Sequence, residues 1–212
     1  MSDKKPQDYW NAVAAEKHFT TEFPESLLES FVPKEAAILD VGCGYGRTLG
    51  MLKRRGYRNL QGVDFSEKMV ARGRKELPEI PFQTADGERL PFDVDSFDGV
   101  ILFAVLTCIV EDSRQERLIA EVRRVLRPGG VLLVNDFLLN DDPRNRKRYQ
   151  AAEKYGTYGV FELPEGVTLR HHDREHLREL LSPFVERLFL PVVFATMNGH
   201  ESRGFCYVGE KR

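Results

Sequence analysis

The stretch Ile38-Leu39-Asp40-Val41-Gly42-Cys43-Gly44-Tyr45-Gly46-Arg47 decides the fold, because an apolar strand pattern runs into glycines at every second position. Gly42, Gly44 and Gly46 have no Cβ, so the chain can adopt positive φ here and bring main-chain N–H and C=O groups against a ligand. Residues 48–53 follow with a helical alternation of apolar and polar side chains. We expect this helix to point its N-terminal amides at the ligand. Strand, loop and helix together predict half of a nucleotide-binding site.

Two charged residues beside this loop bear on which nucleotide it takes. In the dinucleotide fingerprint G-x-G-x-x-G, a pyrophosphate sits on the helix N-terminus, and a carboxylate two residues upstream would repel it. Asp40 stands at that upstream position, and Arg47 stands where the fingerprint has a glycine. A ligand with an ammonium and a sulfonium, such as S-adenosylmethionine, would instead be attracted by Asp40. The loop therefore favours a methyl donor over a nicotinamide.

Composition bounds the class of protein. The 212 residues are 42% hydrophobic, which suits one core and one domain with appendages. The formal net charge of -2 argues against a surface built for nucleic acid, and no apolar run approaches the roughly 20 residues of a membrane helix. Residues 1–6 are polar and form no apolar run, so we do not expect a secreted protein. The cysteines are far apart and lack metal spacing, so we expect a cytoplasmic protein with reduced thiols at Cys43, Cys108 and Cys206.

Strand and helix patterns alternate from about residue 36, which is typical of a parallel sheet covered by helices on both faces. The expected strands are 36–42, 58–64, 80–85, 97–104 and 130–136. The expected helices between them are 46–55, 66–77 and 112–127. Ser66 is expected to cap the second of these helices.

After Asp136 the pattern breaks. Residues 137–168 are polar, aromatic and punctuated by glycine, with a helical stretch only at 144–154, which is typical of a lid or a binding loop. A helix at 173–182 and a strand at 188–196 follow. Asn198-Gly199 predicts a tight hairpin into a last strand at 203–209.

The predicted fold is α/β: a doubly wound, mostly parallel seven-stranded sheet of the Rossmann-like type, with an antiparallel C-terminal strand. One domain is expected over 1–212. Its parts are an N-terminal helical cap at 1–32, built from Gln7 to Thr20 and Pro24 to Phe31; a cofactor-binding core at 33–136; a lid or substrate segment at 137–175; and a C-terminal helix and hairpin at 176–212.

Four motifs resemble those of the class I S-adenosylmethionine-dependent methyltransferases of the small-molecule type, similar to methyltransferase type 11. Residues 38–46 resemble the first motif, and Gly62-Val63-Asp64-Phe65-Ser66 resembles the second. Residues 85–92 with 96–101 are similar to the stretch that leads into the fourth strand, and 126–130 is typical of the fifth. The resemblance covers about residues 30–136 and, in outline, the terminal hairpin. It implies that the chain binds S-adenosylmethionine and transfers its methyl group.

The cofactor-binding residues expected at the strand ends have separate roles. Asp64 lies about 20 residues beyond the glycine loop, where a carboxylate can accept both ribose hydroxyls. Asp86 can accept a hydrogen bond from an adenine amino group while the Gly87 amide faces a ring nitrogen. The alternative for these carboxylates is capping or turn formation. Candidates to enclose the adenine, or else to pack in the core, are Phe65, Leu106, Met69 and Phe103.

Methyl transfer from a sulfonium is a direct displacement, so alignment of the acceptor supplies much of the catalysis and a general base is optional. Candidate bases are Asp136, at the end of the fifth strand, and His171 or His172, which could lie over the methyl group if 137–175 folds back. The plainer alternative is that Asp173 caps a helix and the histidines pair locally. A histidine metal site is not expected, because adjacent histidines point apart and no other ligand completes the set.

We expect a small-molecule acceptor, with no nucleic acid and no membrane as partner. The residues after the fourth strand lack the Asn/Asp-Pro-Pro-aromatic motif that this family uses on nucleic-acid amino groups, and there is no Pro-Cys nucleophile. Arg144, Arg146, Lys147 and Arg148 could hold an anionic acceptor or form a solvent-facing helix. Tyr149, Tyr155, Tyr158 and Phe161 could line an aromatic pocket or pack the lid. The alternative functions are a regulatory S-adenosylmethionine-binding protein and a nicotinamide-dependent oxidoreductase.

Overall fold

The computed structural model describes residues 6–195 and 199–212. Within them the main sheet has seven strands in the order β3-β2-β1-β4-β5-β9-β8. The first five strands pair in parallel, and β9 runs antiparallel to both β5 and β8. The prediction of a doubly wound, mostly parallel sheet with an antiparallel C-terminal strand is therefore confirmed. The strands are β1 Ala37–Val41, β2 Asn59–Asp64, β3 Phe82–Thr84, β4 Phe97–Phe103, β5 Leu126–Phe137, β8 Val185–Ala195 and β9 Glu201–Glu210.

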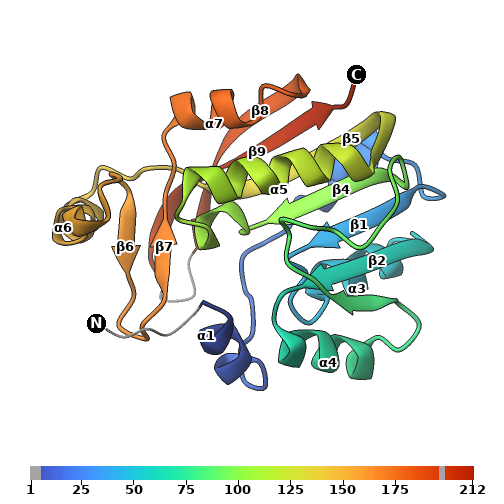
Figure 1. Ribbon diagram of the computed structural model, residues 1–212, viewed down its shortest axis with the longest axis horizontal. Coiled ribbons are helices and arrows are strands. Elements are labelled where there is room, and N and C mark those ends of the chain that lie inside the picture. Colours follow the sequence, from blue (N-terminus) through green and yellow to red (C-terminus); the bar gives the residue numbers. More distant parts are fainter. Residues whose placement is uncertain (1–5, 196–198) are drawn as a thin grey trace.

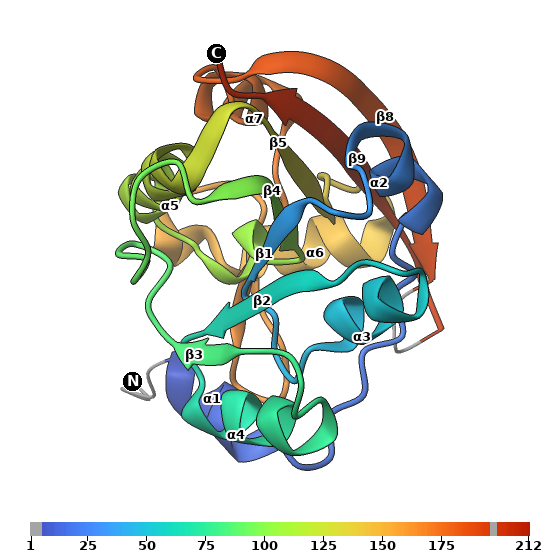
Figure 2. The same ribbon diagram turned by 90° about the vertical axis from the view of Figure 1, so that its right-hand side faces the viewer.

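Helices cover both faces of this sheet, and Figure 2 shows α3 and α5 on opposite sides of it. Buried side chains from α2, α3 and α4 pack on one face, and those from α5 and α7 pack on the other. None of the helices in residues 6–195 and 199–212 has the length and apolarity that crossing a bilayer requires. The helices are α1 Pro6–Val13, α2 Glu25–Phe31, α3 Arg47–Arg54, α4 Glu67–Glu76, α5 Asp112–Val125, α6 Pro143–Ala151 and α7 Arg174–Leu180, with 3-10 turns η1 Leu106–Cys108 and η2 Glu153–Tyr155.

Strand β1 marks the point where the strand order reverses. It pairs in parallel with β2 on one side and with β4 on the other, so Asp40 lies opposite both Gly62 and Ile101. The chain then leaves β1 and β4 on different sides of the sheet, because α3 and α5 lie on opposite faces. In open α/β sheets, such a reversal opens a crevice at the carboxyl ends of the strands, where ligands bind.

Side-chain caps fix the starts of three helices. The Ser66 hydroxyl accepts a hydrogen bond from the N–H of Met69, as the sequence predicts. Asp142 caps α6 in the same way, with proline at the first helical position. Asp173 accepts from the N–H of His176 and begins α7, which confirms the plainer reading of Asp173.

The segment 137–175, which we call the lid segment, is more regular than the sequence indicates. After α6 and η2 the chain forms an antiparallel pair of short strands, β6 Val160–Glu162 and β7 Thr168–Arg170. Figure 1 shows α6, β6 and β7 gathered at one end of the main sheet. The prediction missed this pair, because three-residue strands are too short to show a period-two pattern.

The start of β5 differs from expectation, and the turn between β8 and β9 is only partly described. The strand expected at 130–136 begins earlier, because β5 already pairs Leu126 with Phe97 and then shifts register past Gly129, whose φ is 78°. Strands β8 and β9 pair as far as Ala195 opposite Glu201, as a hairpin requires. Asn198, expected in that hairpin, lies outside the described residues.

Candidate active site

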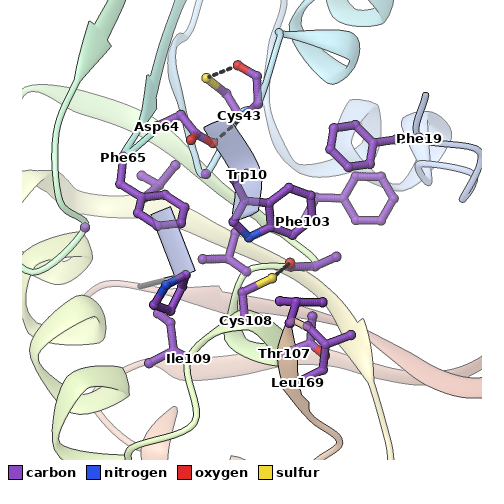
Figure 3. Close-up of a pocket in the computed structure, with 18 of the residues that line it drawn as sticks. Trp10, Phe19, Cys43, Asp64, Phe65, Phe103, Thr107, Cys108, Ile109 and Leu169 are labelled. Atoms are coloured by element: carbon purple, nitrogen blue, oxygen red, sulfur yellow. Dashed lines mark hydrogen bonds between the residues drawn. The ribbon is translucent and has the colours of Figure 1, made fainter. Parts of the chain in front are cut away.

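A cavity of about 310 Å³ lies at the carboxyl ends of β1, β2 and β4, within the range of ligand pockets. Its lining comes from three separate parts of the fold (Figure 3). Trp10 and Phe19 come from the N-terminal cap, Asp64 and Phe103 from the sheet edge, and Leu169 from the lid segment. The cap and the lid therefore close one space over the sheet.

The glycine loop forms the floor of this cavity and needs its glycines. Gly42, Gly44 and Gly46 have φ of 72°, 55° and 84°. A Cβ on Gly42 would stand 2.7 Å from the Val105 side chain. Gly42 and Gly44 line the cavity, whereas Gly46 does not. Gly46 instead turns the chain into α3 against the Phe82 ring, so its contribution is the shape of the loop.

Asp40 is buried at the end of β1 and lines the cavity, and its Oδ2 atom has no hydrogen-bond partner. Burial, reinforced by the nearby charge of Asp64 and opposed by that of Arg47, raises the pKa of Asp40 to about 8. A buried polar atom without a partner is uncommon in a folded protein, and a bound ligand is one way to satisfy it. The carboxyl therefore fits a cationic group of a bound molecule.

Asp64 is buried at the end of β2 and is oriented by the backbone. Its Oδ2 accepts a hydrogen bond of 2.8 Å from the N–H of Gly44, and its Oδ1 accepts one of 2.8 Å from the N–H of Ser66. Burial raises the pKa of Asp64, and these two hydrogen bonds oppose that shift. A carboxylate has about four acceptor sites, so two remain for a ligand with paired hydroxyls.

Asp86 also lines the cavity, but its environment differs from that of Asp64. It lies two residues beyond β3, its side chain is 61% exposed, and Oδ2 is 3.7 Å from the Arg114 guanidinium. Its Oδ1 accepts a hydrogen bond from the N–H of Glu88. Gly87 lines the cavity beside it, and a Cβ there would be 2.9 Å from Leu118. Asp86 is thus the most exposed of the three carboxylates.

Phe65, Met69 and Phe103 line the cavity, but Leu106 does not. Leu106 is fully buried in the core between the sheet and α5, because the η1 turn directs it inward. Ile109 lines the cavity in its place. The expectation that Leu106 contacts a ligand is corrected accordingly.

Asp136 is fully buried and does not line the cavity. Its carboxylate accepts hydrogen bonds from the N–H groups of Thr107 and Phe137, at 3.2 and 2.8 Å. Burial raises the pKa of Asp136 to about 7. Because this carboxyl is used by the turn after β4, the structure does not bring Asp136 to an acceptor as the expected base.

The adjacent histidines point in different directions. His172 is buried outside the cavity, where its Nε2 lies 2.8 Å from Gln115 Nε2 and its ring stacks on His176. His171 lines the cavity. Only one of the two candidate histidines therefore reaches the site, and His172 pairs locally instead.

Hydrogen bonding fixes the proton of His171. Its Nδ1 lies 2.7 Å from the Tyr149 hydroxyl and 3.5 Å from the Asn140 Nδ2. Tyr149 accepts from the N–H of Asn140, which leaves its own proton for Nδ1. Burial, with the charge of Arg148, lowers the pKa of His171 to about 3. The lowered pKa favours a neutral ring, and the contacts at Nδ1 favour a proton on Nε2, which would make His171 a hydrogen-bond donor rather than the expected base.

Arginines occupy both ends of the cavity. Arg47 lines it after the glycine loop, with its guanidinium 5.2 Å from the centre of the Phe103 ring. Arg144 and Arg148 line it from α6. Across residues 6–195 and 199–212, no three His, Cys, Asp or Glu side chains are grouped so as to hold a metal ion.

The contributions of Trp10, Phe19 and Leu169 to the cavity were not predicted. Trp10 and Phe19 fall within the N-terminal cap expected at 1–32, but nothing in their spacing connects them to a site more than 20 residues away. The run of aromatic residues in a short amphipathic segment was the available signal.

A reversal point in a parallel sheet, with buried carboxylates ending two neighbouring strands, defines a protein that binds a nucleotide-like cofactor. Residues 38–130 match a family model described as a methyltransferase domain. The structure is similar to that of a S-adenosylmethionine-dependent methyltransferase from Methanosarcina mazei, with a TM-score of 0.84 and 25% identity over 91% of this chain and 99% of that one. The family-model match and this structural likeness support a place for the chain in the class I S-adenosylmethionine-dependent methyltransferase family.

Two curated relatives match over shorter stretches. A demethylmenaquinone methyltransferase of Clavibacter sepedonicus is 36% identical over 53% of this chain and 45% of the relative. A ubiquinone/menaquinone biosynthesis C-methyltransferase of Roseobacter denitrificans is 31% identical over 59% of this chain and 52% of the relative. The chain thus spans about half the length of these relatives. The comparisons favour a methyltransferase over the nicotinamide-dependent alternative.

Proposed function

We propose that this protein transfers the methyl group of S-adenosylmethionine directly to a small-molecule acceptor held under the lid segment. The observation that carries the proposal is the unpartnered buried Oδ2 of Asp40, in the same cavity as the backbone-oriented carboxylate of Asp64. That pair suits a ligand with a cationic group and two adjacent hydroxyls. The acceptor class is supported by the names of the relatives, which are methyltransferases in quinone biosynthesis.

In this proposal each cavity residue keeps the role that its surroundings allow. Asp40 holds the ammonium of the cofactor and Asp64 its ribose hydroxyls, while the backbone of the glycine loop approaches closely. Asp86 and Gly87 contact the adenine edge. Phe65, Met69 and Phe103 cover the adenine faces, since all three line the cavity.

S-adenosylmethionine supplies an electrophilic methyl group on a good leaving group. The chain supplies position and shelter, which is where most of the rate enhancement for such a displacement arises. Trp10 and Phe19 cover the cavity from the cap, and Phe161 and Leu169 cover it from the lid segment. The neutral His171 donates a hydrogen bond that orients the acceptor.

Three titrations and one turnover assay test this function. Calorimetry of the full chain should give micromolar-range binding of S-adenosylmethionine and S-adenosylhomocysteine, and none of NADH. Incubation with S-adenosylmethionine and a panel of phenols, amines and carboxylic acids should then release S-adenosylhomocysteine with at least one acceptor. Absence of heat with both sulfur ligands would contradict the proposal, and binding without turnover would favour the regulatory alternative.

A further inference from the structure

The lid end of the cavity carries two arginines with little to neutralise them. Arg144 and Arg148 stand one helical turn apart on α6, and both line the cavity. Arg148 makes no ion pair with a carboxylate in the described part of the chain. Its Nη2 donates to Asn145 Oδ1 at 2.5 Å, and its Nε is buried without an acceptor. This guanidinium is therefore short of acceptors.

Arg144 is also weakly partnered. Its ion pair is with Asp142, at 3.9 Å between Nε and Oδ1. That carboxylate is already used by the helix cap, because Asp142 accepts from the N–H and the side-chain amide of Asn145. The two guanidinium groups thus remain available to a third, anionic group.

The remaining walls here are mostly apolar. The Arg148 guanidinium lies 4.0 Å from the centre of the Phe161 ring, which covers one of its faces. Burial and the neighbouring charge of Arg144 lower the pKa of Arg148, so holding this cation here is costly without a counter-charge. Other lining side chains at this end are Phe137, Leu163, Val167, Leu169, His171 and Ser202.

The four basic residues of α6 lie on two different faces of the helix. Arg146 and Lys147 are exposed and lie outside the cavity lining, whereas Arg144 and Arg148 are partly buried within it. The sequence left open whether this basic run binds an anion or only faces solvent. In the structure one half of the run faces the cavity and the other half faces solvent.

We propose that Arg144 and Arg148 form an anion-binding subsite for the methyl acceptor, which is therefore a molecule with an apolar body and a carboxylate or phosphate group. The planar guanidinium fork matches either anion. The inference rests on the proposed function of the cavity. The carboxylate of the cofactor has a different cation available, because Arg47 lies near enough to Asp40 to influence the pKa of that carboxyl.

The test uses the full chain saturated with S-adenosylhomocysteine. Calorimetry measures binding of benzoate, 2-naphthoate and decanoate, of the three corresponding amides, and of 2-naphthyl phosphate. The variants are Arg148→Met and Arg144→Met, which remove the charge and keep most of the apolar length, and Arg148→Lys, which restores the charge. Arg146→Met on the exposed face is the matched control, and circular dichroism checks folding.

We expect at least one anionic probe to bind tenfold or more tightly than its neutral amide. Arg148→Met and Arg144→Met should each weaken that probe about tenfold, Arg148→Lys should recover part of the loss, and Arg146→Met should stay within twofold. Comparison of 2-naphthoate with 2-naphthyl phosphate then identifies the preferred anion. The affinity for S-adenosylhomocysteine should stay within twofold in every variant.

Three results would overturn the inference: no anion binds better than its amide, the control loses as much as Arg148→Met, or the cavity variants lose S-adenosylhomocysteine and not the probe. If S-adenosylhomocysteine fails to bind the unmodified chain, the proposed function fails. The anion titrations of the unloaded chain then still decide whether the arginines bind anions.

Discussion

The cofactor end and the lid end of the cavity are built from different kinds of contact. At the cofactor end, backbone N–H groups of Gly44 and Ser66 hold Asp64, which lies within about 20 residues of both. At the lid end, side chains hold side chains: the Tyr149 hydroxyl holds His171, and the Phe161 ring covers Arg148. Contacts made by the backbone are preserved as long as the fold is preserved. Contacts made by side chains can be altered by substitution, so that the same fold binds a different ligand.

The largest expected effect is a loss of folding stability on substitution of Gly46, in the glycine loop at the cofactor end. Gly46→Ala places a Cβ 2.4 Å from the buried Phe82 ring at a φ of +84°, so both strain and overpacking oppose folding. We expect a loss of about 3 kcal/mol of unfolding free energy, measured by urea titration. Gly56→Ala is the control, because its φ of +94° is similar and nothing lies within 4 Å. It should lose about 1 kcal/mol; equal losses would contradict the packing argument.

Asp64→Ala should produce the next largest effect, on ligand binding. The variant removes an acceptor that two N–H groups hold in place, so we expect affinity for S-adenosylhomocysteine to fall about 100-fold. Asp86→Ala should cost less than about tenfold, since a carboxylate that is largely exposed contributes little. Calorimetry of both variants measures the ratio. A larger loss for Asp86→Ala would reverse the order of the two carboxylates.

The cofactor end of the cavity is easier to predict from sequence than the lid end, because it is built from local backbone contacts. Strands β1, β2 and β4 begin and end within a residue or two of expectation, because glycine, acidic residues and apolar runs act over a few positions. Asp136 and Leu106 were assigned to the cavity because they lie near strand ends. Which way such a residue points depends on the turn that follows, and for Leu106 that turn is η1.

The lid segment is the part of the site that the sequence predicts least well. The sequence indicates that neighbouring histidines diverge, but not which of the two enters the cavity. The choice depends on Tyr149 and Asn140 reaching His171, and on Gln115 reaching His172 from α5. Contacts between residues 22 to 57 positions apart leave no local pattern to detect.

At the lid end, a smaller effect is expected from His171, which makes the free energy of unfolding depend on pH. Burial lowers the pKa of His171 from 6.5 to about 3, so the folded form binds this proton more weakly than the unfolded form. Stability from this group is present above pH 6.5 and is lost as pH falls toward 3. Between pH 6.5 and 5 the loss is about 1.5 kcal/mol.

His171→Gln should flatten the pH dependence of the unfolding free energy by that amount over this range. Urea titrations at pH 6.5, 6 and 5 measure it. Parallel curves for the variant and the unmodified protein would contradict the neutral, donor state of the ring.

At the cofactor end, Asp40 links ligand binding to a proton. Burial raises the pKa of Asp40 to about 8, so the carboxyl is mostly protonated at pH 7 before a ligand binds. A bound ammonium favours the charged form, and the proton then leaves. Affinity for S-adenosylhomocysteine should therefore rise with pH by up to about tenfold per unit below pH 8.

Counting that proton tests most directly whether the buried carboxyl of Asp40 receives the cationic group of the cofactor. Calorimetric titration of S-adenosylhomocysteine at pH 7, in buffers of low and high ionisation enthalpy, gives the number of protons released. We predict close to one proton for the unmodified protein and none for Asp40→Asn, with weaker binding. The same proton count in both proteins, or binding that Asp40→Asn leaves unchanged, would contradict the account.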